Sequence, residues 1–430
     1  MIGGTRMAQR GAAFGQPGRP GPAGEPGGSL RVLLLNWRDS GHPEGGGAES
    51  FLERMASGLH RLGHDVTVRC AWYPGAATDE VIDGVRYTRR GGRFSVYPRT
   101  AGCLARHRRR YDVVVDVQNG FPFWTPLFTR ARVVNVTHHL HREQWQVIFG
   151  PLLGRVGWWL ESRVAPLVYG RCRYVTVSGA TRDDLIGLGI PAERVRVVYS
   201  GVDAPILPVD ADTWPRSAAP SLVVLGRLVP HKRVELALTT LAELADTYPE
   251  ASLTIIGHGY WEPTLRALAD RLGVADRVTF AGFVDDVTKH QLLAQAWLHV
   301  LPSVKEGWGL VVIESAAHGT PTVAFRSAGG TQESVLDGET GLLVDDEAGF
   351  VAATRRLIED EALRVRLGHQ ARVHAAKFSW PAAVEVFEAE LREITGLPRR
   401  VRPVPQPRPG TDAARAAEVL EAEPTAAAGQ

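Results

Sequence analysis

The chain has few cysteines, little net charge and no long apolar run, and each shortage excludes a class of protein. Its three cysteines are scattered without C-x-x-C spacing, and an odd number argues against a disulfide framework. A formal net charge of +2 disfavours wholesale binding of nucleic acid. No run approaches the ~18 apolar residues of a membrane span, and the amino-terminal stretch lacks the apolar segment of a signal peptide. We therefore expect a cytoplasmic protein.

Lysine is also scarce, because almost every basic residue is an arginine. The only four lysines are Lys232, Lys289, Lys305 and Lys377. Two of them, Lys232 and Lys305, fall within the motifs described below, which suggests that a compact ammonium group is required there.

Short β-branched runs alternate with helical stretches along the chain, and this alternation predicts parallel sheets covered by helices. A proline-rich stretch at 203–220 interrupts the pattern and indicates an interdomain linker. We therefore expect an α/β protein with two Rossmann-like, doubly wound parallel-sheet domains that face each other across a cleft. The expected strands are 32–37, 66–70, 113–117, 133–137, 174–177, 195–199, 221–225, 253–256, 278–280, 298–301 and 322–325.

The segment from Pro302 to Glu314 is the most informative in the chain. It places Glu306 and Glu314 eight residues apart around a glycine-rich turn, after a buried strand and at the start of a helix that begins near Leu310. Free N–H groups at such a helix start can donate to sugar hydroxyls or phosphate oxygens. The two carboxylates can therefore hold different parts of one extended ligand, and a nucleotide-sugar has that shape.

This segment resembles the E-x7-E signature of the family 4 glycosyltransferases, which are retaining enzymes with the two-domain GT-B fold. Other motifs resemble that family in the same order, over roughly residues 30–395. They are the glycine loop 45–49, the Gly226-Arg227-Leu228 element with Lys232, and the late loop 329–344.

The resemblance implies that one domain binds the acceptor and the other binds the nucleotide-sugar. The expected boundaries are a disordered tail at 1–29, an acceptor domain at 30–204, a linker at 205–220, a nucleotide-sugar domain at 221–378, a terminal crossover helix at 379–396 and a disordered tail at 397–430. Both tails are rich in Gly, Pro and Ala and poor in large apolar residues.

A departing nucleoside diphosphate carries two or three negative charges, so positive groups held in place are expected to stabilise it. Arg227 follows a strand end and Lys232 precedes a helix, so both can point at a diphosphate on that helix. The alternative for both residues is a solvated turn. The resemblance implies that Glu306 orients the donor sugar, whereas its alternative role is to cap the helix near Gly309.

The resemblance also implies further donor contacts. Glu314 would accept from the ribose hydroxyls, and His138 would contact the donor sugar, with His139 as its substitute. The other expected donor-binding residues are Gly46, Gly47, Gly226, Gly282, Phe283, Gly307, Trp308, Gly309, Leu310, Gly329 and Gly330.

Three histidines follow a strand end in the first half of the chain and invite comparison with a metal site. They lack a carboxylate partner of recognisable spacing, and GT-B enzymes generally need no bound metal, so we expect neither a metal nor another cofactor. The residues expected on the acceptor side, with a structural role as the alternative, are His139, His141, Arg142, Gln144 and Trp145.

Nine arginines and no acid lie between Arg86 and Arg110. Such a patch suits an anionic acceptor or peripheral contact with the inner face of an anionic membrane, and a solvated surface is the alternative. The segment from Ile148 to Tyr169 fits either an amphipathic helix that seeks membranes or a half-buried helix, and we expect core packing there.

The expected function is transfer of a sugar from a nucleotide-sugar to an acceptor hydroxyl with retention of configuration. The alternative is a non-catalytic protein of the same fold that binds nucleotide or carbohydrate. A metal-dependent GT-A enzyme would need a D-x-D pair at a strand end, whereas Asp210 and Asp212 lie in the proline-rich linker. A dinucleotide-dependent oxidoreductase would need a glycine fingerprint that the sequence lacks. The sequence identifies neither the donor sugar, the base nor the acceptor.

Overall fold

The computed structural model of the protein describes residues 28–203 and 214–400. Most of the two expected tails, most of the expected linker, and Asp210 with Asp212 lie outside the described residues. The part of the linker that is described is held by Arg216, whose guanidinium donates to Thr320 Oγ1 at 2.6 Å and to the Gly319 carbonyl at 2.6 Å. This stretch is therefore fixed to the second half of the chain.

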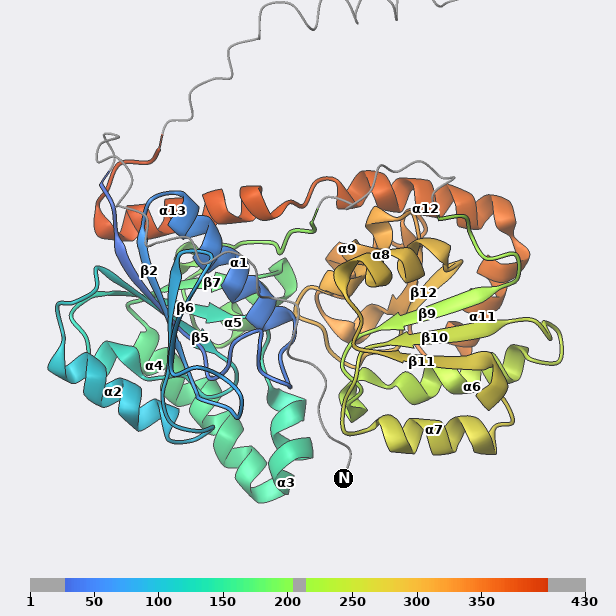
Figure 1. The fold of residues 1–430 in the computed structure, drawn as a ribbon, viewed down its shortest axis with the longest axis horizontal. Helices are drawn as coiled ribbons and strands as arrows, with labels where there is room; N and C mark the ends of the chain where they lie inside the picture. Colours follow the sequence, from blue (N-terminus) through green and yellow to red (C-terminus); the bar gives the residue numbers. More distant parts are fainter. Residues whose placement is uncertain (1–27, 204–213, 401–430) are drawn as a thin grey trace, which may run out of the picture. The chain divides into compact units, whose positions relative to one another are not determined.

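The first half of the chain forms an eight-stranded sheet in the order β3-β4-β2-β1-β5-β6-β7-β8 (Figure 1). Its strands are β1 (Arg31–Leu35), β2 (Asp65–Cys70), β3 (Asp79–Ile82), β4 (Val85–Arg89), β5 (Val113–Gln118), β6 (Arg132–Thr137), β7 (Arg173–Thr176) and β8 (Val195–Val197). The helices are α1 (Gly47–Arg61), α2 (Val96–Arg106), α3 (Arg142–Trp159), α4 (Ala165–Tyr169) and α5 (Gly179–Gly187).

The central strands form because their β-branched runs are buried on both faces; every residue of β5 is buried. Strand β3 pairs antiparallel with β4, so the expectation of a wholly parallel sheet is wrong at this edge. Neither strand was expected, and β3 lacks the apolar run of a core strand because three of its four residues are exposed. The Asp83-Gly84 turn between them, with φ of 50° and 81°, is the signal that could have found the hairpin.

The second half forms a six-stranded, wholly parallel sheet in the order β11-β10-β9-β12-β13-β14. Its strands are β9 (Ser221–Leu225), β10 (Ser252–Ile256), β11 (Val278–Gly282), β12 (Leu298–Leu301), β13 (Thr322–Phe325) and β14 (Gly341–Val344). The helices are α6 (Val234–Leu244), α7 (Glu262–Arg271), α8 (Asp286–Gln295), α9 (Leu310–Ala317), α10 (Thr331–Ser334), α11 (Glu347–Glu359) and α12 (Glu361–Ala375).

The fold is therefore the expected α/β arrangement of two doubly wound sheets. The strand order reverses between β1 and β5 in the first sheet and between β9 and β12 in the second. Ligands of open α/β sheets bind at the carboxyl ends of the strands beside such a reversal. Strand β14 belongs to the expected late loop, so the end of that loop is regular structure.

Helix α13 (Trp380–Thr395) follows the second sheet in sequence but packs on α1 of the first domain. A Cβ atom on Gly58 would lie 2.3 Å from Val384 Cγ2, so glycine permits the close approach of the two helices. Phe51 and Phe387 meet edge to face with ring centroids 6.4 Å apart.

The segment from Ile148 to Tyr169 is not one half-buried helix. Gly150 has non-helical dihedral angles inside α3, a π-helix covers Leu160–Val164, and α4 ends the segment. The expectation of core packing is wrong for its large apolar side chains at positions such as Leu152 and Leu153, which are 74% and 62% exposed. None of the helices within residues 28–203 and 214–400 is long and apolar enough to cross a membrane.

Candidate active site

Four loops at the carboxyl ends of strands each carry at least one expected site residue. Gly46 lies between β1 and α1, and His138 follows β6. Arg227 follows β9, and Glu306 follows β12. Because β1, β9 and β12 border the two reversals in strand order, the loops after these three strands occupy the positions at which α/β sheets bind ligands, and the loop of His138 follows the second strand from the first reversal.

An ion pair joins two of the expected catalytic residues across 74 positions of sequence. Lys232 Nζ donates to Glu306 Oε1 at 2.6 Å, with side chains 21% and 11% exposed. Burial alone would raise the pKa of Glu306, but the charge and hydrogen bond of Lys232 outweigh it and lower that pKa. Glu306 is therefore ionised at neutral pH. Gly309 precedes α9 without a side-chain cap, so the alternative role of Glu306 as a helix cap is wrong.

Arg227 is half-buried beside the first-domain glycine loop. A Cβ atom on Gly46 would lie 3.4 Å from Arg227 Nε, so the two loops are neighbours. Burial lowers the pKa of Arg227, and the nearby charge of Arg38 acts in the same direction. No carboxylate in the described ranges forms an ion pair with this guanidinium within 4.0 Å. A desolvated cation without a close counter-ion is suited to an anionic ligand.

Glycines let the site loops approach one another by their backbones. A Cβ atom on Gly307 would lie 2.4 Å from the His138 carbonyl oxygen, and one on Gly330 would lie 2.2 Å from the Gly307 carbonyl oxygen. Gly309 and Gly329 have φ of 83° and 79°, which side-chain-bearing residues rarely adopt. The expected donor-binding glycines 307, 309, 329 and 330 therefore form one backbone cluster beside His138, and Leu310 begins α9 next to it.

A second row of glycines ends three adjacent strands of the second sheet. Gly226 N donates to the Ile256 carbonyl at 2.9 Å, and Gly257 N donates to the Gly282 carbonyl at 2.8 Å. Phe283 follows this row with its side chain 65% exposed. An exposed ring beside bare backbone offers a surface against which a nucleotide base can pack. Gly47 begins α1, and a Cβ atom there would meet no atom within 4 Å.

His138 is buried and its Nε2 has no hydrogen-bond partner within the described part of the chain. Burial lowers its pKa to about 4, and the neighbouring charge of His141 acts in the same direction. The imidazole is therefore neutral at physiological pH, so it can exchange a hydrogen bond with a ligand hydroxyl.

The residues expected on the acceptor side gather around a carboxylate that the sequence analysis missed. Glu161 is buried and pairs with His141 Nδ1 at 3.0 Å, while it accepts from Trp145 Nε1 at 2.7 Å. Gln144 Nε2 lies 3.2 Å from His139 Nε2, which completes the group. The expectation that these histidines lack a carboxylate partner is therefore wrong for His141.

Arg142 is the expected acceptor-side residue that the structure does not bring into this group. It is exposed, and its guanidinium lies 5.8 Å from the ring centroid of Trp158. Within residues 28–203 and 214–400, no three His, Cys, Asp or Glu side chains are grouped so that they could hold a metal ion.

Glu314 lies on α9 and is paired with a residue that the sequence analysis did not place in the site. Lys289 Nζ donates to Glu314 Oε1 at 2.9 Å and to Asp286 Oδ1 at 3.0 Å. Burial raises the pKa of Glu314, although Lys289 acts against that rise. The scarcity of lysine could have identified Lys289, because three of the four lysines lie in site loops or contact expected site residues: Lys232, Lys289 and Lys305.

The side chain of Trp308 belongs to an aromatic cluster. Its ring is buried and lies 4.6 Å from Tyr199 and 5.0 Å from Phe378, measured between ring centroids. The indole therefore packs in the protein interior, and only the backbone of Trp308 lies with the glycines that are expected to bind the donor.

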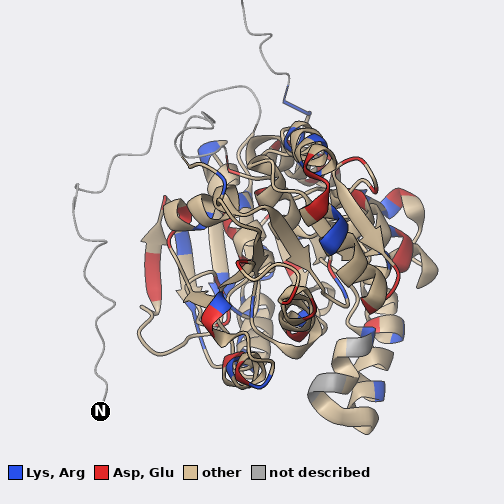
Figure 2. Cartoon of the chain, turned by 90° about the vertical axis from the view of Figure 1, so that its right-hand side faces the viewer, with Lys and Arg blue, Asp and Glu red and all other residues tan. Residues whose placement is uncertain are grey.

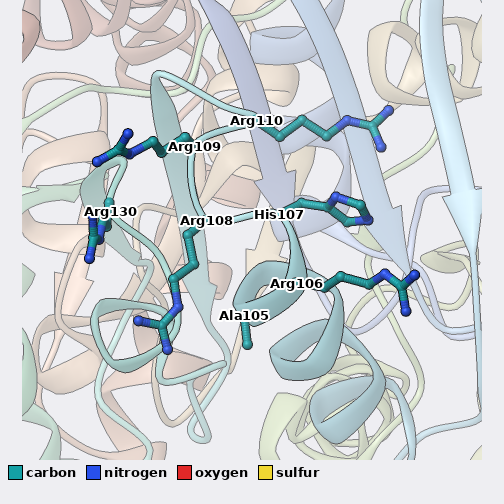
Figure 3. A pocket seen from close by; sticks show the side chains of 7 residues that line it. All are labelled: Ala105, Arg106, His107, Arg108, Arg109, Arg110 and Arg130. Carbon is teal, nitrogen blue, oxygen red and sulfur yellow. The ribbon is translucent and has the colours of Figure 1, made fainter.

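The nine arginines from Arg86 to Arg110 do not form one patch. Arg89 is buried and paired with Asp39 at 2.6 Å, and Arg90 is paired with Asp79 at 2.5 Å. Figure 3 shows a pocket of about 510 Å³ farther along, lined by Ala105, Arg106, His107, Arg108, Arg109, Arg110 and Arg130. Its arginine side chains point in different directions rather than toward one point, so they do not build a site for a single anion.

Two doubly wound domains with charged loops at the carboxyl ends of their strands are the architecture of the GT-B fold. Sucrose-phosphate synthase from Thermosynechococcus elongatus has a similar fold, with a TM-score of 0.73, 21% identity, and coverage of 85% of this chain and 99% of that one. Anabaena HepE in complex with UDP-glucose has a TM-score of 0.66 at 20% identity, over 85% of this chain and 100% of that one.

Sequence comparisons identify the family. Residues 214–374 match Glycosyl transferases group 1, and residues 45–204 match Glycosyltransferase Family 4. A glycogen synthase of Mycobacterium tuberculosis is 33% identical over 404 residues, which cover 84% of this chain and 95% of the relative. The chain belongs to the family 4 glycosyltransferases and is a nucleotide-sugar-dependent enzyme.

Other relatives show how varied the family is. A D-inositol 3-phosphate glycosyltransferase of Acidothermus cellulolyticus is 38% identical over 239 residues, and this chain spans about half of its length (53%). A GDP-mannose-dependent alpha-(1-6)-phosphatidylinositol monomannoside mannosyltransferase of Mycolicibacterium smegmatis is 29% identical over 370 residues, which cover 79% of this chain and 92% of the relative.

Proposed function

We propose that the chain transfers a sugar from a nucleotide-sugar to an acceptor hydroxyl with retention of configuration, and without a bound metal. One observation carries the proposal. The half-buried Arg227, which has no carboxylate partner within 4.0 Å in the described ranges, lies at the end of the same sheet as the Lys232–Glu306 pair at 2.6 Å. Two cations at these positions can hold a diphosphate.

The reaction that this arrangement supports is a substitution on one face of the donor sugar. The bond between the sugar C1 and the diphosphate oxygen breaks, and the acceptor oxygen bonds to C1 from the same face. The acceptor's proton passes to the leaving phosphate oxygen, so charge and atoms balance. No side chain is assigned as a nucleophile.

The chain's own residues supply position and charge. Arg227 and Lys232 stabilise the negative charge that develops on the diphosphate, and Glu306 keeps Lys232 in place and orients the sugar. Neutral His138 contacts a sugar hydroxyl, Glu314 accepts from the ribose, and Phe283 packs against the base. His139, His141, Gln144 and Trp145 form the acceptor side around Glu161.

A non-catalytic protein that binds nucleotide or carbohydrate, the alternative that the sequence left open, does not fit a chain that belongs to a family of nucleotide-sugar-dependent enzymes. Turnover of a matched donor tests this directly.

The test is thermal unfolding of the purified protein with UDP, GDP, ADP and dTDP, each with Mg²⁺ and with EDTA. A ligand at a hundred times its dissociation constant stabilises the folded state by about 2.7 kcal/mol. One nucleotide should raise Tm equally with and without EDTA, and Arg227→Ala should abolish that rise. The matched control is Arg271→Ala, which removes an exposed arginine at the end of α7.

Two results would contradict the proposal. The first is an absence of any nucleotide-dependent shift, which would remove the diphosphate site. The second is a shift that requires Mg²⁺, which would favour metal-dependent donor binding.

A further inference from the structure

Helix α3 is a hairpin of two helical segments (Figure 1). Gly150 breaks the helix with φ of 74° and ψ of 176°, and Pro151 follows it. Cβ atoms on Gly154 and Gly157 would lie 2.8 Å from Gln146 Cα and 2.3 Å from the Trp145 ring. These glycines therefore let the second segment pack directly against the first.

The hairpin exposes large apolar side chains to solvent. Four of these side chains lie on one face of the second segment, because they are spaced one, three and three residues apart: Leu152, Leu153, Val156 and Trp159. The exposed fractions are 74% for Leu152, 62% for Leu153, 50% for Val156, 56% for Trp159 and, next to the turn, 38% for Phe149. A concentrated apolar surface of this kind marks an interaction site rather than scattered surface residues.

The charges around this apolar face are mostly basic. Residues 142–171 hold four arginines and two acids, Glu143 and Glu161, and Glu161 is buried and hydrogen-bonded to His141 and Trp145. Arg155 and Arg163 are exposed on the same stretch. In Figure 2 the hairpin, at the lower right, is drawn mostly in tan with basic segments in blue.

We propose that the α3 hairpin docks this chain on an anionic membrane, with its apolar face in the boundary between headgroups and acyl chains. Exposed Leu and Trp beside Arg is the composition of helices that lie in that boundary. The arginines meet anionic headgroups while the leucines leave water. A second copy of the chain is a poorer partner for this face, because a symmetric contact would bring the exposed Arg155 and Arg163 of the two copies toward each other.

One consequence of the docking surface rests on the proposed function, and it concerns the class of acceptor. His141 precedes the first segment of the hairpin and Trp145 lies on it, so the acceptor-side group is built on the element that meets the membrane. The acceptor hydroxyl is then carried by a lipid headgroup, which reaches the site from the bilayer surface.

The test is co-sedimentation of the full chain with vesicles of phosphatidylcholine alone and of phosphatidylcholine mixed with phosphatidylglycerol. The wild type should bind the mixed vesicles, and salt should weaken the binding. Leu152→Glu combined with Leu153→Glu should reduce the partition coefficient by at least ~100-fold. Arg155→Gln combined with Arg163→Gln should reduce it by about 25-fold on mixed vesicles and leave binding to neutral vesicles unchanged.

The matched control is Val365→Glu combined with Val373→Glu, which alters two exposed valines of α12 and should leave binding unchanged. Equal binding of the leucine variant and the wild type would overturn the proposal. A wild type that stays in solution as a dimer, with the leucine variant monomeric in light scattering, would assign the face to a second copy instead.

The nucleotide-dependent Tm shift separates this proposal from the proposed function. It should persist in the leucine variant, because α3 is not part of the donor loops. If the wild type binds vesicles but no nucleotide raises its Tm, the donor site is refuted and the docking surface is supported. If a nucleotide raises the Tm but the wild type does not bind vesicles, the docking surface is refuted and the donor site is supported.

Discussion

Replacing Lys232 with Met tests the central ion pair, because methionine has a similar length and no charge. In the wild type, Glu306 has a lowered pKa, since the attraction of Lys232 outweighs burial. Its pairing therefore stabilises the fold above the unfolded-state pKa of about 4.5 and is lost as pH falls through the folded-state value. In Lys232→Met burial dominates, and the pKa of Glu306 should rise above that of the unfolded chain.

The expected cost at pH 7.5 follows from the burial of the pair. Removing one partner of a buried pair costs 3–5 kcal/mol, and the low end of about 3 kcal/mol applies because Lys232 is 21% exposed. A raised carboxyl pKa makes the variant regain stability as pH falls, by up to ~1.4 kcal/mol for each pH unit. The gap between variant and wild type should therefore narrow toward pH 4.5.

Urea unfolding of both proteins between pH 7.5 and 4.5 measures this gap. Glu306→Gln added to Lys232→Met should recover most of the lost free energy of unfolding, because no unpaired charge remains. Activity should be abolished both in Lys232→Met and in the double variant. A gap that is constant with pH, or a double variant no more stable than the single one, would refute the reasoning.

Two further predictions concern the acceptor side and the glycine cluster. Glu161→Gln should lower the rate of sugar transfer to the acceptor about tenfold, because the charged hydrogen bonds to His141 and Trp145 are lost. A change in the nucleotide-dependent Tm shift of this variant would contradict a purely acceptor-side role. Gly307→Ala should lower kcat at least ~tenfold, because its methyl group would lie 2.4 Å from the His138 carbonyl oxygen. The control is Gly187→Ala, whose methyl group would meet no atom within 4 Å, and it should match the wild type in the same transfer assay.

The sequence predicted eleven strands, including those buried on both faces such as β5, but it missed β3, β4 and β14. Runs such as Val113 to Val117 are identifiable because a strand buried on both faces is apolar throughout. The position of Glu306 at the end of such a run, before a helix, placed it in the site. Its pairing with Lys232 depends on β9 and β12 being neighbours in the sheet. The order of strands in a sheet cannot be predicted from local sequence patterns.

The misses have physical reasons of the same kind. Glu161 was assigned to an ordinary helix because its partners, His141 and Trp145, approach it only after the chain reverses at Gly150. The Gly150-Pro151 pair was itself a turn signal. The exposed face of α3 was expected in the core, because periodicity shows that a helix has an apolar face but not what covers it.

The return of α13 to the first domain has a consequence for synthesis. A ribosome that has completed residues 30–204 has made the whole first sheet, yet the face of α1 around Phe51 and Gly58 stays uncovered until residues 380–395 emerge. The first domain therefore completes its core last, after the second domain has had time to fold. A fragment that ends after the first sheet should expose this apolar face and aggregate, whereas the same fragment supplied with an α13 peptide should stay in solution.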